Sequence, residues 1–227
     1  MKQTAQSEIC LPWIVCEMRR KEANILKRVR AMPLGSGLLV IINIIVFLAC
    51  MFTGGMLYDA GILNVRGVLW QKEYGRILWA MFLHGSVNHI FNNMLILFFL
   101  GAMIEKEIGH IRFFLFYFLS GISGNLLSLY VKVWNGDVSG TVGASGAIFG
   151  LDGVLLSMVL LRGRKIENAT PARVMLMILL SLYSGYTGGN IDNAAHIGGL
   201  LAGFAAGSIM CIVERKKNRD QEASGEY

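Results

Sequence analysis

Residues 143–150, Gly-Ala-Ser-Gly-Ala-Ile-Phe-Gly, open a long apolar segment and decide how the rest of the chain is interpreted. Ser145 stands there between small residues. Serine and glycine are common where transmembrane helices pack closely, and Gly146 and Gly150 form a small-xxx-small pair. Helix packing is therefore one interpretation of Ser145, and a nucleophilic hydroxyl is the other. A histidine in another apolar segment and a cluster of histidine and asparagine in a third favour the nucleophilic hydroxyl.

The composition is that of a membrane protein. Of the 227 residues, 54% are hydrophobic and only 16% are charged, and the mean hydropathy is +0.53. A soluble domain of this length carries more charge and fewer uninterrupted apolar runs. The net charge of +6 does not indicate a nucleic-acid partner, because the basic residues concentrate in the N-terminal arm, in alternate gaps and in the tail. The partner that the composition predicts is the lipid bilayer.

Six apolar runs predict an all-α, polytopic membrane protein with a bundle of six transmembrane helices. The runs cover residues 34–52, 86–104, 111–133, 144–161, 172–186 and 194–213. We expect a six-helix membrane domain at 34–213, between an N-terminal arm at 1–33 and a basic, polar tail at 214–227. No internal repeat indicates a transporter built from two halves.

The distribution of charge predicts the orientation. Basic clusters occur in the arm and at 105–112, 162–173 and 214–219. The three opposite gaps contain only the basic residues Arg66, Lys72, Arg76 and Lys132. Because positively charged loops remain in the cytoplasm, six spans place both termini there, in a plasma or inner membrane.

Polar residues gather at one membrane depth on this topology. Ser145 begins the fourth run and His196 the sixth, while His84, His89 and Asn93 lie at the outer end of the second. His89 and Asn93 are four residues apart and share a helix face. Polar side chains in a membrane are costly and face a bundle interior or a wet cavity. The shared depth therefore predicts one common site on three helices.

The sixth run offers two interpretations of His196. An interhelical hydrogen bond would account for the histidine alone. However, small residues recur at every fourth position, at Ala195, Gly199, Gly203 and Gly207. Such a stripe would pack against the glycines of the fourth run and bring His196 close to Ser145. Phe149, one turn after Ser145, is either ordinary core filling or a packing partner of the imidazole.

The combination of these side chains suits acyl transfer. Serine becomes nucleophilic when a base takes its proton, and neutral imidazole does so near pH 7. The oxyanion of the intermediate needs hydrogen-bond donors, which Asn93, His89 and the backbone N–H of Ser145 offer. Asp192, four residues before His196, is expected in the outer loop, so a Ser145–His196 dyad is favoured. This chemistry requires no metal and no organic cofactor.

Three spaced motifs make the sequence resemble the rhomboid intramembrane serine proteases over nearly all of residues 37–213. The motifs are His84-x4-His89-x3-Asn93, Gly143-Ala144-Ser145-Gly146 and Ala195-His196-x-Gly198-Gly199. The resemblance implies a serine-type endopeptidase that cleaves transmembrane segments of single-span membrane proteins. In it, Ser145 would be the nucleophile and His196 the general base. The resemblance also implies supporting roles near the oxyanion for Asn93, His89 and Gly143, and structural roles near the site for His84, Phe149 and Gly199.

Gly75 stands where rhomboids usually have a tryptophan before the arginine, here Arg76. This departure leaves the packing of the first loop open.

Rival interpretations explain less of the sequence. A non-catalytic rhomboid-like protein that binds client transmembrane segments would lack the serine or the histidine, and both are present. A channel or transporter predicts broken helices and internal symmetry. A zinc protease needs His-Glu-x-x-His, and the pair His84 and His89 has neither that spacing nor the glutamate. The sequence identifies neither a natural substrate nor an oligomeric state.

Overall fold

The computed structural model describes residues 15–21, 32–162, 166, 169–187 and 191–224. Residues 15–21 are helical, and most of the predicted arm, 1–14 and 22–31, lies outside the described residues. The remaining elements, in chain order, are α2 (Leu34–Phe52), α3 (Met56–Gly61), η1 (Arg66–Trp70), α4 (Arg76–Trp79), η2 (Ala80–Phe82), α5 (Val87–Ile108), α6 (His110–Asn135), α7 (Ser145–Leu161), α8 (Pro171–Thr187) and α9 (Asn193–Ser224).

The fold is all-helical and belongs to an integral membrane protein. Four helices, α2, α5, α6 and α9, are long and apolar enough to cross a membrane, and α7 and α8 are shorter apolar helices of 17 residues. Each of the six predicted apolar runs is thus a helix, although the number of membrane spans stays a prediction. The sixth run ends at residue 213 by hydropathy, whereas α9 continues to Ser224.

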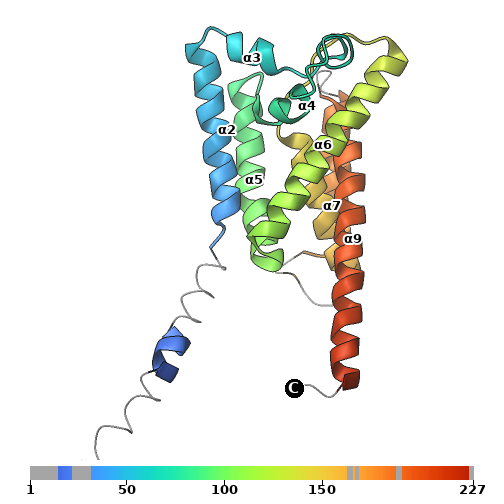
Figure 1. The fold of residues 1–227 in the computed structure, drawn as a ribbon. Helices are drawn as coiled ribbons and strands as arrows, with labels where there is room; N and C mark the ends of the chain where they lie inside the picture. The colour runs from blue at the N-terminus through green and yellow to red at the C-terminus, as the bar shows by residue number, and fades with distance from the viewer. Residues whose placement is uncertain (1–14, 22–31, 163–165, 167–168, 188–190, 225–227) are drawn as a thin grey trace, which may run out of the picture.

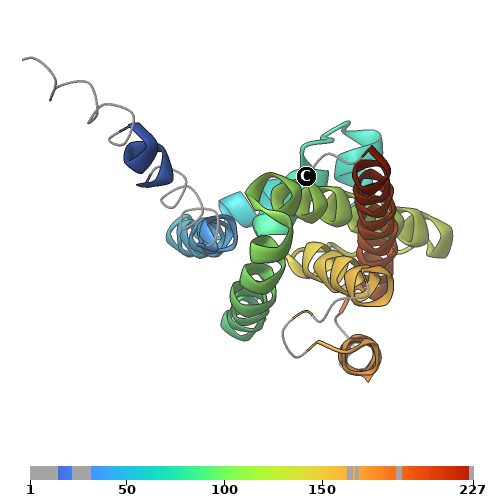
Figure 2. The same cartoon turned by 90° about the horizontal axis from the view of Figure 1, so that it is seen from below.

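The helices are arranged around α7. This helix packs most extensively against α9 and also against α6 and α5, while α2 packs mainly on α5 (Figure 1). Viewed along the bundle, α8 lies at its periphery beside α7 and α9 (Figure 2). Ser145 therefore starts the helix that is most enclosed by the others.

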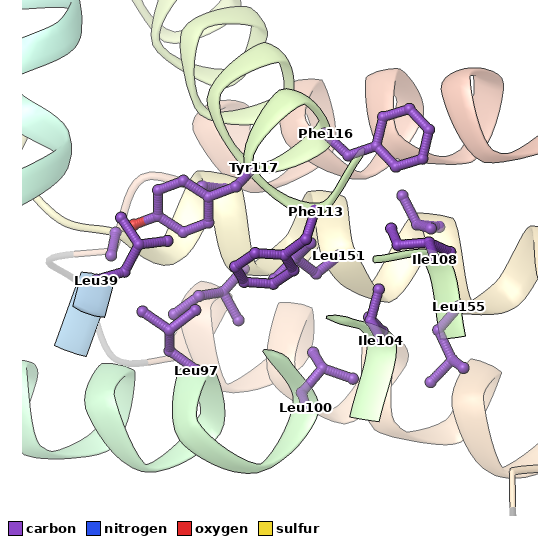
Figure 3. Packing of buried hydrophobic residues seen from close by; sticks show 14 of the residues in the cluster. Leu39, Leu97, Leu100, Ile104, Ile108, Phe113, Phe116, Tyr117, Leu151 and Leu155 are labelled. Carbon is purple, nitrogen blue, oxygen red and sulfur yellow. The ribbon is translucent and has the colours of Figure 1, made fainter. Parts of the chain in front are cut away.

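The core lies where α5, α6 and α7 meet (Figure 3). On α5, the buried side chains Leu97, Leu100, Ile104 and Ile108 recur every three or four residues and so form one face of the helix. Phe113 and Tyr117 of α6 fill the space opposite this face and are completely buried. This packing fixes α5 against α6 and α7.

Local signals explain the ends of α5. The hydroxyl of Ser86 accepts a hydrogen bond from the backbone N–H of His89 at 3.2 Å and caps the first turn. At the other end Gly109 has a φ of +82°, a conformation that glycine adopts at little cost. α6 begins at the next residue and runs back towards the other end of the bundle, diverging from α5 (Figure 1).

A buried carboxylate holds α2 against α5 at the end of the bundle far from Ser145. The N-cap of α2 is Pro33, whose side chain makes no capping hydrogen bond. Instead, the backbone N–H groups of Gly35 and Ser36 donate to Glu105 of α5 at 2.6 and 2.8 Å, and His110 also contacts this carboxylate. Glu105 is 0% exposed. It is therefore the cap that the sequence of α2 lacks.

Arg76 organises the first loop, between α2 and α5. One of its terminal nitrogens donates to the carbonyl oxygens of Asp59 at 2.8 Å and Ile62 at 2.9 Å, and Nε bonds Glu73 at 2.6 Å. A Cβ at Gly75 would meet no heavy atom of the described chain within 4 Å. The loop thus packs through Arg76, and the position where rhomboids usually have tryptophan faces open space.

Candidate active site

Glycines bring α7 and α9 into backbone contact. A Cβ added at Gly199 would overlap the carbonyl oxygen of Gly146, and one added at Gly203 would overlap that of Gly150. Only glycine fits at these positions, because any larger side chain would push the helices apart. The stripe of small residues in α9 therefore packs against the glycines of α7, as the sequence predicts.

This close packing places Ser145 next to His196. Ser145 is the first residue of α7 and His196 lies in the first turn of α9. The distance between Ser145 Oγ and His196 Nε2 is 2.9 Å, a hydrogen bond. His196 is only 5% exposed. An imidazole that carries its proton on Nδ1 would accept the serine proton at Nε2, which is the arrangement that a general base requires.

Phe149 and α6 fix the position of the His196 ring. Phe149, one turn into α7, stacks on the imidazole with ring centroids 4.2 Å apart and an angle of 14° between the planes. On the other side, a Cβ at Gly124 of α6 would lie 2.5 Å from the carbonyl oxygen of Ala195. The first turn of α9 is therefore held between α6 and α7.

Gly143 has no side chain and so allows α5, which carries His89 and Asn93, to approach Ser145. Its φ is +134°, and a Cβ there would lie 2.9 Å from both Cε1 and Nε2 of His89 and 3.6 Å from Nδ2 of Asn93. His89 and Asn93 thus face the segment that leads into Ser145. The N–H of Gly143 donates to the carbonyl oxygen of Ala80 at 2.9 Å. Gly143 supports the site through its shape, because its own N–H is already bonded.

Asn93 carries an unused donor at this place. The residue is 6% exposed, and its Nδ2 has no hydrogen-bond partner in the part of the chain that the structure describes. A buried donor without a partner is costly, so its presence points to a ligand or intermediate that accepts from it. The first-turn N–H groups of α7, beginning with that of Ser145, have no partner within the helix either.

His84 lies beside the site. Its ring meets the ring of His89 edge to face, with centroids 5.0 Å apart and an angle of 67°. It therefore packs against His89, and its predicted structural role near the site stays a prediction.

The carboxylate of Asp192 bonds groups other than the imidazole of His196. It accepts hydrogen bonds from Ser128, from Thr141 Oγ1 at 2.7 Å and from the N–H of Ala195 at 3.0 Å. Nδ1 of His196 has no hydrogen-bond partner among the described residues. Within the described part of the chain, the serine–histidine pair has no acid as third member.

Asp152, two turns below Ser145 in α7, is buried, and nothing in the structure explains it. No group of three or more His, Cys, Asp or Glu side chains that could hold a metal ion occurs within the described residues.

The fold and the site together define a polytopic helical membrane protein with a hydrogen-bonded serine–histidine pair, in which the histidine is buried and the serine is half-buried. Residues 71–213 match the Rhomboid domain. The chain belongs to the rhomboid family.

Curated relatives support this assignment. RHOMBOID-like protein 4 of Arabidopsis thaliana is 39% identical over 159 residues, which are 69% of this chain and 39% of that protein. Rhomboid protease GluP of Bacillus subtilis (strain 168) is 29% identical over 198 residues, 86% of this chain and 38% of GluP. Putative rhomboid protease YdcA of the same bacterium is 32% identical over 160 residues, 70% of this chain and 75% of YdcA. The chain thus spans well under half the length of the first two.

Proposed function

We propose that the protein is an intramembrane serine endopeptidase that cleaves transmembrane segments of single-span membrane proteins. The observation that carries this proposal is the 2.9 Å contact between Ser145 Oγ and His196 Nε2, made at the starts of two helices in glycine-mediated contact. The names of two bacterial relatives, rhomboid protease GluP and putative rhomboid protease YdcA, support it.

We propose a six-span topology with both termini in the cytoplasm of a plasma or inner membrane. The membrane domain would occupy 34–213, with the arm at 1–33 and the tail at 214–227 as cytoplasmic segments. The 17 residues of α7 give a helix of about 26 Å, a little shorter than a hydrocarbon core of about 30 Å. Because α7 is enclosed by α5, α6 and α9, its ends need not match the thickness of the lipid.

The proposed reaction begins with attack of Ser145 Oγ on the scissile carbonyl carbon, while His196 Nε2 takes the hydroxyl proton. The negative oxygen of the tetrahedral intermediate accepts from Asn93 Nδ2, from the His89 ring and from the N–H of Ser145. His196 then gives its proton to the leaving amine. A water molecule, deprotonated by His196, attacks the acyl-enzyme and releases the second product and the serine.

The location of the pair restricts the substrate. A peptide bond in an intact transmembrane helix has its carbonyl engaged in a hydrogen bond, so the segment must unwind locally before Ser145 can attack. Segments with small or helix-breaking residues near the outer membrane face unwind most easily. We therefore expect such segments to be cleaved in preference to uninterrupted leucine-rich ones.

The test uses detergent-solubilised protein and a fluorophosphonate probe, which reacts only with an activated serine. Wild type and Ser157→Ala should be labelled, whereas Ser145→Ala and His196→Ala should not. Ser157 is the matched control, because it is a buried serine on the same helix whose hydroxyl bonds the carbonyl oxygen of Val154 at 2.7 Å. Thermal unfolding verifies that each variant is folded.

If Ser145→Ala were labelled as strongly as the wild type, the assignment of Ser145 as the nucleophile would be refuted. A folded wild type that is not labelled would refute the protease and favour the alternative, a non-catalytic rhomboid-like protein that binds client transmembrane segments.

A further inference from the structure

A polar cluster lies just outside the site, at the same end of the bundle. Its members are Ser128 on α6, Thr141 in the segment before α7, and Asp192 immediately before α9. The two oxygens of the Asp192 carboxylate have different partners. Oδ1 accepts from the N–H of Ala195 at 3.0 Å, and Oδ2 accepts from the hydroxyls of Ser128 and Thr141, the latter at 2.7 Å.

Oδ1 fixes the helix turn that contains His196. Asp192 precedes the first residue of α9, and its bond to the N–H of Ala195 is an N-cap with the negative charge at the favourable end of the helix. The backbone oxygen of Asp192 also accepts from the N–H of His196 at 3.2 Å. The position of the imidazole along the helix axis therefore depends on the position of Asp192.

Oδ2 connects that turn to the segment that carries the serine. Thr141 precedes Ser145 by four residues, just as Asp192 precedes His196 by four. Thr141 is itself held by two backbone hydrogen bonds with Leu63, at 2.8 and 3.1 Å. One carboxylate thus links the approach to Ser145, the first turn of α9 and, through Ser128, helix α6.

The carboxylate is charged at neutral pH. Burial by itself would raise the pKa of Asp192, but the hydrogen bonds from Ser128, Thr141 and Ala195 outweigh burial and hold the pKa below its usual value. Lys132, one turn beyond Ser128 on α6, adds a smaller effect in the same direction. Both oxygens therefore act as acceptors under working conditions.

We propose that Asp192 is a positioning residue that sets the separation of Ser145 Oγ and His196 Nε2 without touching the reacting atoms. The proposal rests on the proposed protease function. The glycine contacts of Gly199 and Gly203 hold α7 and α9 together below the pair, and Asp192 completes the alignment above it. Because catalysis depends steeply on the alignment of nucleophile and base, loss of this link lowers the rate more than it lowers binding.

The test separates the two oxygens. Asp192→Asn keeps an acceptor that caps α9 but removes the second acceptor, and Thr141→Val removes the partner of that second acceptor that leads to Ser145, leaving Ser128 as the other. The matched control is Asp137→Asn. Asp137 lies in the segment before α7, as Thr141 does, but its carboxylate bonds Ser139 and Lys132. For each variant, the maximal labelling rate and the half-saturating concentration of the fluorophosphonate probe are measured separately, together with the midpoint of thermal unfolding.

We expect Asp192→Asn and Thr141→Val each to lower the maximal labelling rate on the order of 10- to 100-fold, with the half-saturating concentration within about twofold of wild type. The double variant should be no slower than the slower single variant, because both remove one link. Asp137→Asn should label like wild type.

Three results would overturn the proposal: an unchanged labelling rate in Asp192→Asn, a change confined to the half-saturating concentration, or independent, multiplying losses in the double variant. If the wild type is labelled and one of these results is found, only the role of Asp192 is refuted. A folded wild type that is not labelled refutes the protease and, with it, this proposal.

Discussion

Helices α7 and α8 have the same length, 17 residues, and opposite surroundings. Nearly every side chain of α7 from Gly146 to Met158 is buried. Among the α8 side chains that the structure describes, Val174 and Ile178 are buried and the rest are exposed or half-buried. Both helices are apolar, so hydrophobicity does not decide which of them occupies the centre.

The difference lies in the small residues. α7 has Gly146, Gly150 and Gly153 along the line where it meets α9, whereas the first turns of α8 consist largely of leucine, methionine and other large residues. Lipid chains are as apolar as leucine, so helices associate in a membrane through close packing and not through the hydrophobic effect. The glycines therefore determine which helix is enclosed and, with it, where Ser145 lies.

The largest expected effect comes from adding one methyl group to this packing. Gly199→Ala should lower the free energy of unfolding by about 3 kcal/mol, because the new Cβ overlaps the Gly146 carbonyl oxygen and the helices must separate. Gly37→Ala in α2 is the matched control: a Cβ there meets no heavy atom of the described chain within 4 Å, and it should stabilise by about 0.5 kcal/mol through helix propensity. Unfolding in rising concentrations of SDS measures both. Equal effects of the two variants would contradict the role of the glycines.

A smaller effect is expected where α8 contacts the bundle. Ile178→Ala should lower the free energy of unfolding by roughly 2 kcal/mol, since it leaves a cavity against buried neighbours. Leu179→Ala, at an exposed neighbouring position, should change it by less than about 0.5 kcal/mol, because lipid or detergent replaces the lost contacts. The same SDS titration compares the pair. If Leu179→Ala lowered the free energy of unfolding more than Ile178→Ala, the face of α8 that carries Leu179 would pack against protein and not against lipid.

Asp137, in the segment before α7, should make a small contribution to stability that depends on pH. Hydrogen bonds from the backbone and hydroxyl of Ser139 and from Lys132 lower the pKa of Asp137 to about 2. Because this folded pKa lies below the unfolded value of about 3.9, the contribution to stability is complete above about pH 4 and is lost as the pH falls through 2. Asp137→Asn should therefore melt slightly below wild type at pH 7 and together with it near pH 2. A difference that grows with acidity would contradict this assignment.

Replacing Gly75 in the first loop should have no measurable effect on stability or on labelling. Gly75→Trp places a large side chain where the described chain leaves open space. The midpoint of thermal unfolding and the probe-labelling rate should both stay at wild-type values. A changed labelling rate would show that this loop, outside the α7–α9 contact, also controls the site.

Local patterns in the sequence were enough to predict the helical segments and the approach of His196 to Ser145. Apolar runs predicted the helices, and glycines that recur every fourth residue predicted the approach of His196 to Ser145. Hydropathy predicted a membrane span that ends at residue 213 and did not predict that α9 continues to Ser224, because a helix stops at a breaker and not at the membrane surface. Residues 214–224 contain no proline and several strong helix formers, and the next residue, Gly225, is the first glycine after Gly207.

Long-range partners could not be predicted in the same way. Nothing in the local sequence of α5 shows that Glu105 accepts from the first turn of α2, or that Asp192 accepts from Thr141. The available signals were indirect: a carboxylate next to the end of an apolar run, and a helix that begins after a proline with no capping side chain. Such pairs become visible only when the packing brings distant segments together.

The contact between Glu105 and α2 has a consequence for synthesis at the ribosome. The amides of Gly35 and Ser36 precede their acceptor by 70 and 69 residues, so α2 leaves the ribosome well before α5. Until α5 is inserted, the backbone N–H groups of Gly35 and Ser36 lack this acceptor. Insertion of α5 and completion of the start of α2 are thus a single event, and a nascent chain that stops short of Glu105 carries a first helix with an uncapped end.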